Sequence, residues 1–313
     1  MTTHTLYDLV IVGGGPGGMT AGIYAQRAAL KTILIEKGYP GGQMAATDTI
    51  ENWPGTESIT GHEMSENFLA HVKAYNLPIL QEEVAAVVPG TPYHIVRLVN
   101  GEEYPCHAVI IAVGGSPRKL GIPGEHDYYG KGVSYCAVCD GFFFRNKTVV
   151  VIGGGDSAAE ESLYLAKIAK KVYLVHRRDT LRASMILQEK VQAEPIIEIL
   201  WNTVVKEIKG DDFGVNAVKI EDTKSGAQNC LETDGVFVFI GFKPNRQIIP
   251  ADTPMDAEGY VVTDCKGETN NPGIYVIGDL RQKYAKQIVV AAGEGATAAL
   301  AAAHYIDSKE AIS

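Results

Sequence analysis

Short apolar runs alternate along the chain with glycine-rich turns and with longer segments of mixed polarity. The run Leu6–Val12 ends in consecutive Leu and Val or Ile residues, and Thr32–Ile35 is a second short apolar run. Nearly unbroken apolar runs of this length are typical of strands buried on both faces, as in a parallel sheet. Because an alanine-rich segment from Met19 to about Leu30 separates the runs, the pattern predicts a strand–helix–strand unit.

The same order of elements returns further along the chain. Residues 147–152 and 171–175 are predicted to be strands on either side of a helix that begins near Ala159 and ends near Ala169. The segment between the two units predicts a polar helix over 61–75, followed by short strands over 83–88, 93–98 and 103–105.

A glycine-rich turn directly follows the first predicted strand of the first unit. Gly13, Gly15, Pro16 and Gly18 stand where glycine permits a tight turn and the close approach of a pyrophosphate to a helix N-terminus. Glu36 ends the second strand and is placed to accept a hydrogen bond from a ribose hydroxyl. Because strand, loop, helix and acid occur together, the motif predicts a dinucleotide site rather than an ordinary glycine turn.

The second unit has its own turn, and the candidate contacts in it are Gly153, Gly155, Asp156, Ser157 and Ala158. His176 stands where the first unit has Glu36, and Arg177, Arg178 and Arg182 follow it. An acid would repel a 2′-phosphate, whereas arginines bind one through charge-assisted hydrogen bonds. The first site therefore predicts FAD and the second NADPH. A solvated basic turn is the alternative, and three arginines in one place disfavour it.

A second internal repeat relates residues 107–117 to residues 234–244, each an apolar strand followed by glycine and proline. The apolar strand 273–277, which ends at Gly278 and Asp279, has no obvious counterpart in the second half and indicates a return to the first. We therefore expect an FAD-binding domain in two parts, 1–116 and 246–313, with an NADPH-binding domain, 117–245, inserted between them. Three consecutive domains remain the alternative.

Cys136 and Cys139 stand three positions apart just before the second glycine turn, and Asp140 follows them. Two such thiols can close a small disulfide in which each resolves the other, and an adjacent acid can protonate the leaving thiolate. A zinc site needs more ligands, but the other cysteines stand singly and no histidine pair has ligand spacing. Half a metal site or a chance pair stays possible, although the flanking nucleotide motifs favour redox use.

Composition narrows the class of protein. The net charge of −9 disfavours nucleic-acid binding, which depends on neutralising phosphates. Five cysteines are too few for a secreted disulfide framework, and the first residues have neither the basic charge nor the long apolar run of a secretion signal. Glu294 interrupts the alanine-rich C-terminal segment, so no membrane helix is expected. These features predict a cytoplasmic protein with no nucleic-acid, membrane or metal partner.

Together the motifs resemble low-molecular-weight (bacterial-type) thioredoxin reductase over essentially the whole chain. The most specific resemblance is the Cys-x-x-Cys-Asp-Gly-Phe-Phe run that begins at Cys136, inside the inserted domain. The resemblance also assigns flavin contacts to Gly42, Gln43, Asn52, Gly278, Asp279, Lys286 and Gln287. Lys286 departs from the usual arginine but keeps its charge, and Val138 replaces the commoner threonine without removing either cysteine.

The resemblance implies an α/β fold with two Rossmann-like (three-layer) nucleotide-binding domains, the NADPH domain inserted into the FAD domain. It implies an oxidoreductase and flavoprotein in which NADPH reduces FAD, FAD reduces the Cys136–Cys139 disulfide, and the dithiol reduces thioredoxin. Cys139 would face the flavin, Cys136 would attack thioredoxin, and Asp140 would be the acid/base. The resemblance further implies a homodimer and a docking surface at Lys131, Phe142 and Phe143, although at least one of residues 142–144 should be buried.

Other interpretations differ in what receives the electrons. A flavoprotein of the same layout could reduce another disulfide protein, such as a glutaredoxin-like protein or the redox domain of a peroxidase. A dithiol oxidase would pass electrons to oxygen and would not need the arginine cluster. A non-enzymatic redox sensor or a zinc-linked interaction module would carry no FAD that NADPH bleaches.

Overall fold

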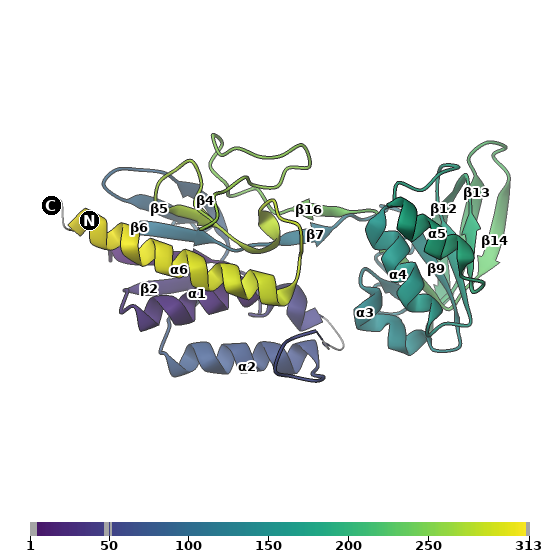
Figure 1. The fold of residues 1–313 in the computed structure, drawn as a ribbon, viewed down its shortest axis with the longest axis horizontal. Helices are drawn as coiled ribbons and strands as arrows, with labels where there is room; N and C mark the ends of the chain where they lie inside the picture. Colours follow the sequence, from purple (N-terminus) through teal and green to yellow (C-terminus); the bar gives the residue numbers. More distant parts are fainter. Residues whose placement is uncertain (1–4, 47–49, 51, 311–313) are drawn as a thin grey trace. The chain divides into compact units, whose positions relative to one another are not determined.

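The computed structural model describes residues 5–46, 50 and 52–310, and the side chains of Ala46, Val138, Cys139 and Glu310 lie outside that description. The chain divides into two compact units. Unit 1 comprises Met1–Ser116 and Lys243–Ser313, and unit 2 comprises Pro117–Phe242 (Figure 1). Where the chain crosses between them, strands β7 (Gly115–Pro117) and β16 (Phe242–Pro244) pair with each other.

The return to unit 1 comes at Lys243, before the expected position 246. Asn245 supplies the physical reason. Its backbone N–H donates to Gly114 O over 3.0 Å, and its side-chain amide donates to Val113 O over 2.8 Å. Asn245 is thus already anchored to unit 1.

The sheet of unit 1 has the order β3-β2-β1-β6-β5-β4, with β17 paired to β6. Strands β1, β2, β3, β6 and β17 are parallel, whereas β4 and β5 are antiparallel additions next to β6. The strands are β1 (Tyr7–Val12), β2 (Thr32–Ile35), β3 (Ile79–Leu80), β4 (Val84–Val88), β5 (His94–Leu98), β6 (Glu103–Ile111) and β17 (Ile274–Val276). The segments predicted as separate strands at 103–105 and from 107 are one strand, β6.

The sequence of strand β1 is almost wholly apolar because both faces of the strand are buried. Leu9 and Ile11 pack into the core on the side of the helices, and Val10 and Val12 pack into a second core on the opposite face. Helix α1 (Pro16–Arg27) lies beside α6 (Ile288–Glu310), with α2 (Gly61–Ala74) beyond them (Figure 1). A Cβ on Gly295 would lie 2.2 Å from Gly17 O, so this helix contact requires glycine.

Helix α6 meets the length and composition criteria for a membrane-spanning helix over Ile288–Lys309, with a mean hydropathy of 1.2. Glu294 does not prevent this, and the core helix of a soluble protein can meet the same criteria. In the structure Ala298, Ala302 and Ile306 are buried in the unit 1 core. The helix is therefore packed as a core helix of unit 1.

Unit 2 has a parallel sheet of order β11-β10-β9-β15-β8 and a separate antiparallel sheet, β12-β13-β14. Its parallel strands are β8 (Val133–Ser134), β9 (Thr148–Gly153), β10 (Lys171–Val175), β11 (Ile197–Leu200) and β15 (Gly235–Phe239). The antiparallel strands are β12 (Thr203–Asp211), β13 (Gly214–Asp222) and β14 (Gln228–Glu232). The helices are α3 (Ala137–Asp140), α4 (Asp156–Ala166) and α5 (Met185–Ala193).

The two parallel sheets repeat one plan. Strands β9, β10, β11 and β15 occupy the places of β1, β2, β3 and β6. The place that β17 takes beside β6 is taken in unit 2 by β8, which pairs in parallel with β15. Residues 273–277 therefore do have a counterpart, contrary to the expectation from the sequence. Strand β8 gives no clear sequence signal, because it is two residues long and precedes the other strands of its sheet.

Candidate functional site: two nucleotide cradles and a redox motif

The candidate flavin contacts of unit 1 lie at the carboxyl end of its parallel strands. Val12 pairs with Ile35 and Ile111, and Ile111 pairs with Val276, so β1, β2, β6 and β17 end at one level. The loops that follow these strands share one edge of the sheet. In open α/β sheets this edge is where ligands bind.

The first glycine turn forms an open cradle at the N-terminus of α1. Gly13 has φ +106°, and a Cβ there would lie 2.5 Å from Ala112 O; a Cβ on Gly18 would lie 1.9 Å from Gly13 O. Both positions therefore require glycine for packing. Gly15 differs, because its Cβ would meet nothing within 4 Å and no side chain caps the helix there. Pro16 begins the helix. The free N–H groups above Gly15 fit a pyrophosphate such as that of FAD.

Glu36 ties the first turn to the loop after β2. Its Oε2 accepts from Gly14 N over 2.6 Å, and its Oε1 accepts from Gly38 N over 2.8 Å. Each carboxylate oxygen has a second lone pair, so this anchoring is compatible with the expected bond from a ribose hydroxyl.

The other predicted flavin contacts come together from distant parts of unit 1. A Cβ on Gly42, which has φ +58°, would lie 3.3 Å from Gly15 Cα, and Gln43 donates from Nε2 to Gly115 O. Asn52 Nδ2 donates to Gln287 Oε1 over 3.1 Å. Lys286 Nζ lies 3.7 Å from the centroid of the Tyr260 ring, so in this structure its ammonium rests on an aromatic face.

Gly278 and Asp279 form the turn η3 (Gly278–Leu280) after β17. Gly278 has φ +68°, and its N–H donates to Glu294 Oε2 over 2.7 Å. Asp279 Oδ1 lies 3.2 Å from Lys283 Nζ. Neither Lys283 nor Glu294 is predicted from the sequence to be a site residue. Lys283 could have been identified from its position four residues after Asp279. Its contact with Glu294 is apparent only in the folded structure.

The second glycine turn repeats the first at the carboxyl edge of unit 2. Gly153 pairs with Phe239, and Ile152 pairs with Val175, so the strands again end together. A Cβ on Gly155 would meet nothing within 4 Å, and no side chain caps α4 there. The cradle therefore fits a second pyrophosphate. The exposed Ser157 lies in the first turn of α4, whereas the adjacent Ala158 is buried.

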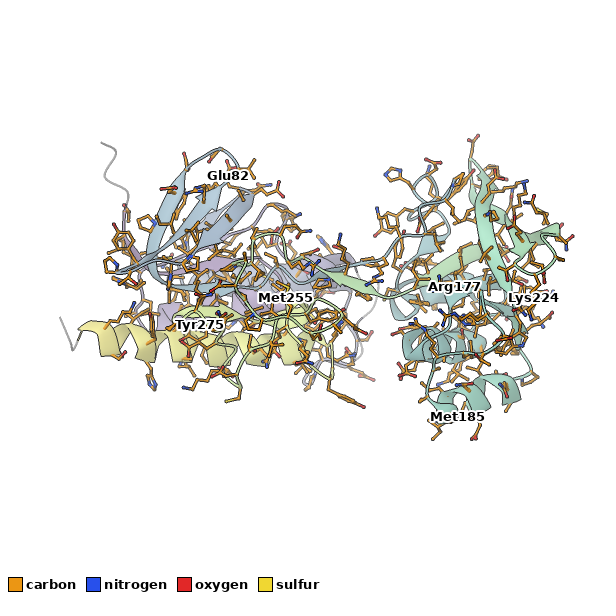
Figure 2. The ribbon with its side chains drawn as sticks, turned by 90° about the horizontal axis from the view of Figure 1, so that it is seen from above. Glu82, Arg177, Met185, Lys224, Met255 and Tyr275 are labelled. Carbon is orange, nitrogen blue, oxygen red and sulfur yellow. The ribbon has the colours of Figure 1, made fainter. Side chains whose placement is uncertain are left out.

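Three hydrogen bonds bind the segment that carries the arginines to this turn, and one of them runs from Ala183 N to Gly154 O over 3.2 Å. Arg182 N donates to Gly154 O over 2.6 Å, and Ser184 N donates to Asp156 Oδ1 over 2.6 Å. Asp156 Oδ1 therefore ties the second glycine turn to Ser184, which directly precedes α5. Arg177, Arg178 and Arg182 are exposed, and Figure 2 marks Arg177 on unit 2. None of the three forms an ion pair within the described part of the chain.

His176 differs from the arginines that follow it. Its ring is buried, and Nδ1 donates to Gly153 O over 2.7 Å. A Cβ on Gly154 would lie 2.1 Å from that nitrogen, so the ring packs directly beneath the turn. The structure thus places His176 as a support of the loop, away from the surface that the arginines share.

The redox motif follows β8 at the same carboxyl edge. Cys136 is disulfide-bonded and half-buried, whereas Cys106, Cys230 and Cys265 are free thiols. Ser134 fixes the backbone of Cys136, because its Oγ accepts from Cys136 N over 3.0 Å and donates to Cys136 O over 3.1 Å. The side chain of Cys139, the predicted flavin-facing thiol, lies outside the described residues.

A buried carboxylate supports this motif from the N-terminal side. Glu125 accepts from Leu120 N over 2.8 Å, from Gly121 N over 2.7 Å and from the Tyr135 hydroxyl over 2.9 Å. Burial and the neighbouring carboxylate raise the pKa of Tyr135, so the phenol stays protonated as a donor. Asp140 N donates to Cys136 O over 3.2 Å and closes the turn of α3.

The three consecutive phenylalanines divide as predicted. Phe144 is 7% exposed and packs against Phe237, whereas Phe142 and Phe143 are 64% and 57% exposed. The expectation that at least one would be buried is confirmed. Lys131 is exposed as well. Two exposed aromatic rings next to a redox disulfide give unit 2 an apolar patch beside its reactive group.

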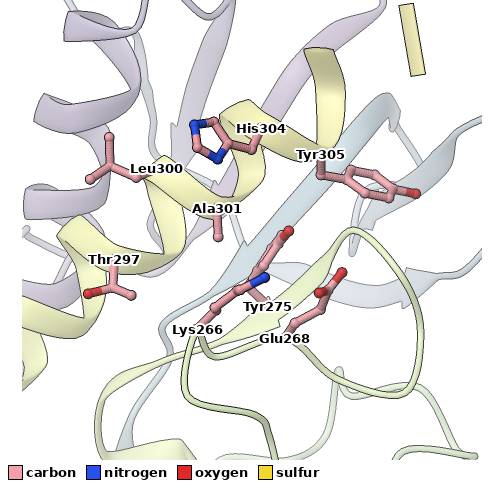
Figure 3. A pocket seen from close by; sticks show the side chains of 8 residues that line it. All are labelled: Lys266, Glu268, Tyr275, Thr297, Leu300, Ala301, His304 and Tyr305. Carbon is pink, nitrogen blue, oxygen red and sulfur yellow. The ribbon is translucent and has the colours of Figure 1, made fainter. Parts of the chain in front are cut away.

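Unit 1 also has a cavity of about 440 Å³ away from these residues. Figure 3 shows it between the second half of α6 and the segment that contains Lys266, Glu268 and Tyr275. No site residue predicted from the sequence lines it. The candidate site is therefore assigned from the two glycine turns rather than from this cavity.

Comparison with known proteins places the chain in context. The family model of pyridine nucleotide-disulphide oxidoreductases matches residues 7–295. A thioredoxin reductase from Bacillus subtilis (strain 168) is 45% identical over 98% of this chain and 97% of its own length. A solved thioredoxin reductase from Streptococcus pyogenes MGAS5005 superposes with a TM-score of 0.83 at 43% identity, covering 98% of this chain and all of that one. A Lactococcus lactis thioredoxin reductase structure gives 0.77 at 42% identity, covering 96% and 99%.

Proposed function

The chain belongs to the pyridine nucleotide-disulphide oxidoreductase family, and from that premise we propose that it is an NADPH-dependent thioredoxin-disulfide reductase. Its relatives of similar length are thioredoxin reductases, and the family uses FAD and NADPH. Both cradles fit those groups. When bound, NADPH supplies a hydride to FAD, whose electron pair reduces the protein disulfide.

The residues of unit 1 hold FAD in this proposal. The N-terminus of α1 at Gly15 binds the pyrophosphate, and Glu36 accepts from the ribose. The loops at Gly42, Asn52 and Asp279 border the flavin. Gln287 belongs to the same border because its side chain is held by Asn52.

The residues of unit 2 hold NADPH. Gly155 and the N-terminus of α4 bind its pyrophosphate, and Arg177, Arg178 and Arg182 bind the 2′-phosphate. Their freedom from ion pairs within the described residues supports this role, because no carboxylate has to be displaced before a phosphate binds. His176 fixes the loop beneath them.

Reduced Cys136 carries out the exchange with thioredoxin. Its thiolate attacks one sulfur of the thioredoxin disulfide, which forms a mixed disulfide and expels the other thioredoxin thiolate. Cys139 then attacks the Cys136 sulfur, which releases reduced thioredoxin and re-forms the protein disulfide. Asp140 gives a proton to the leaving thiolate and takes one from the attacking thiol.

The observation that carries the proposal is the position of Cys136 in unit 2. Its disulfide follows β8 at the carboxyl edge where the Gly153–Gly155 turn also lies, so cofactor cradle and redox group share one side of one sheet. The test is NADPH oxidation by the FAD-loaded enzyme with oxidised bacterial thioredoxin, followed by absorbance. We expect steady turnover that requires thioredoxin. Flavin bleaching without turnover on any thioredoxin, but with turnover on another disulfide protein, would assign a different substrate.

Phe142 and Phe143 are proposed to dock thioredoxin, with Lys131 beside them. Their exposed rings support this role, because aromatic side chains are enriched at the energetic centre of protein interfaces. From the family resemblance we also propose that the protein forms a homodimer and that it is located in the cytoplasm. Light scattering on the purified holoenzyme tests the dimer, and fractionation of the native host tests the compartment.

A further inference from the structure

Four charged side chains of unit 1 gather behind the Gly278–Asp279 turn. Lys283 is 7% exposed, Glu294 14%, Arg281 16% and Asp279 29%. Lysine and glutamate are rarely buried to this extent unless they are paired. The burial of these four charged side chains therefore needs an explanation beyond the packing of the glycine cradle.

Glu294, on α6, joins the members of the cluster. Its Oε2 accepts from Gly278 N over 2.7 Å and lies 3.3 Å from Lys283 Nζ. Its Oε1 lies 3.3 Å from an Arg281 guanidinium nitrogen. Arg281 in turn donates to Asp264 O over 3.2 Å. One carboxylate thus fixes the start of the turn, while the two cations that follow the turn hold that carboxylate in place.

Lys283 extends this brace to Asp279. Its Nζ lies 3.2 Å from Asp279 Oδ1, while its stem is buried. Asp279 is the most exposed of the four side chains, and Lys283 contacts one of its two oxygens. Within the described residues no bond is formed by Oδ2. The carboxylate is therefore held by one oxygen, and the other is left to accept from a ligand at the carboxyl edge.

We propose that Lys283, braced by Glu294, is a positioning residue that holds the Asp279 carboxylate in the orientation that accepts from a hydroxyl of the flavin's ribityl chain. The inference rests on the proposed function, because it requires FAD in the cradle of unit 1. Lys283 acts through Asp279 and does not itself contact the cofactor. Removing Lys283 should leave Asp279 free to rotate and Glu294 without one of its cations.

The test measures the affinity of the apoprotein for FAD by quenching of flavin fluorescence. Lys283→Met keeps the buried stem and removes the charge, and Lys266→Met removes an exposed lysine of unit 1 as a control. A charge-assisted hydrogen bond supplies a factor of about 10 to 100 in affinity. We expect Lys283→Met to weaken FAD binding by about that factor and Lys266→Met to leave it unchanged.

A double-mutant cycle separates positioning from simple loss of stability. If Lys283 acts through Asp279, then in the Asp279→Asn background Lys283→Met should cost no further affinity. An FAD analogue without ribityl hydroxyls should bind wild type and Lys283→Met about equally. If Lys283→Met yields no folded apoprotein, Glu294→Gln replaces it; the amide oxygen still accepts from Gly278 N while the charge that braces Lys283 is gone, and about a tenfold loss for FAD alone is expected.

The outcomes distinguish this inference from the proposed function. Wild-type apoprotein that fails to bind FAD would overturn the proposed function. Tight FAD binding by wild type with unchanged affinity in Lys283→Met would overturn only the positioning role. Losses that are equal for FAD and the deoxy analogue, or that add in the double mutant, would also overturn it, because they would show a general structural effect.

Discussion

Asn52 donates a hydrogen bond from Nδ2 to Gln287 Oε1 over 3.1 Å, although 235 positions separate the two residues. Asn52 lies between the short helix η1 (Gly42–Ala46) and α2, and Gln287 directly precedes α6. Both were expected to contact a flavin on the basis of family motifs. Their bond places the two motifs against each other at the edge where the other predicted flavin contacts lie.

The first prediction uses two glycines of one turn as a matched pair. Gly18→Ala brings a Cβ within 1.9 Å of Gly13 O, so the apoprotein should lose about 1–3 kcal/mol or more in free energy of unfolding. Gly15→Ala meets no protein atom within 4 Å and should change that free energy by less than about 1 kcal/mol. Its FAD affinity should nevertheless fall at least about tenfold, because the methyl group occupies space assigned to the pyrophosphate.

Urea unfolding of both apoproteins and FAD titration of Gly15→Ala measure these effects. Undiminished FAD affinity in Gly15→Ala would mean that the pyrophosphate does not lie above this residue.

The second prediction concerns the arginine cluster. Arg177→Ala/Arg178→Ala should reduce the ratio of kcat/KM for NADPH to that for NADH by about a hundredfold or more, because each charge-assisted bond to phosphate contributes about 1.5–3 kcal/mol. Lys209→Ala, an exposed cation elsewhere on unit 2, should leave the ratio unchanged. A preference retained in the double variant would place the 2′-phosphate at other residues.

The third prediction tests the exposed aromatic pair. Phe142→Ala/Phe143→Ala should raise KM for thioredoxin by about tenfold or more, whereas the rate of flavin reduction by NADPH should not change. Phe213, 99% exposed in the turn between β12 and β13, gives the control variant Phe213→Ala. An equal KM in the two variants would assign docking to another surface.

The fourth prediction concerns pH and His94 in unit 1. Its ring is buried, with Nδ1 accepting from Gly90 N over 3.2 Å and Nε2 donating to Pro272 O over 3.1 Å. Desolvation is the main cause that lowers the pKa of His94, while the bond to Pro272 opposes it and Lys309 and His107 lower the pKa further. The folded protein therefore binds a proton at His94 less readily than the unfolded chain does.

The sign of the pH effect follows from this difference. Below about pH 6.5 the unfolded chain takes up a proton that the folded ring resists, so the free energy of unfolding should fall as the pH decreases from neutral. Urea unfolding at several pH values, compared with His94→Gln, isolates this contribution. A wild-type curve with the same slope as that of His94→Gln between pH 7 and pH 5 would show that His94 does not contribute.

Much of the fold could be predicted because the determinants are local in sequence. Residues adjacent in sequence are enough to predict several features: the apolar runs of β1 and β9, the glycine turns and the arginines after β10. The helices α1 and α4 begin at Pro16 and Asp156, earlier than Met19 and Ala159, because Gly15 and Gly155 already serve as N-caps.

What could not be predicted depends on contacts between distant segments. Strand β8 has only two residues. It is defined as a strand by its parallel pairing with β15, which lies more than 100 positions later in the sequence. That pairing puts the redox motif in the place that Gly278–Asp279 holds in unit 1. Similarly, no local pattern shows that His176 turns inward beneath Gly154 or that Glu294 reaches Gly278 and Lys283.

The central claim is that electrons from NADPH pass through bound FAD to the disulfide of Cys136. The most direct test is an anaerobic titration of the FAD-loaded protein with NADPH, with Cys136→Ser and the exposed free thiol variant Cys230→Ser alongside. Flavin and disulfide each accept one electron pair, so wild type and Cys230→Ser should take up about twice as much NADPH per flavin as Cys136→Ser. Equal uptake by all three proteins would contradict the account, because it would show that the disulfide does not receive the electrons.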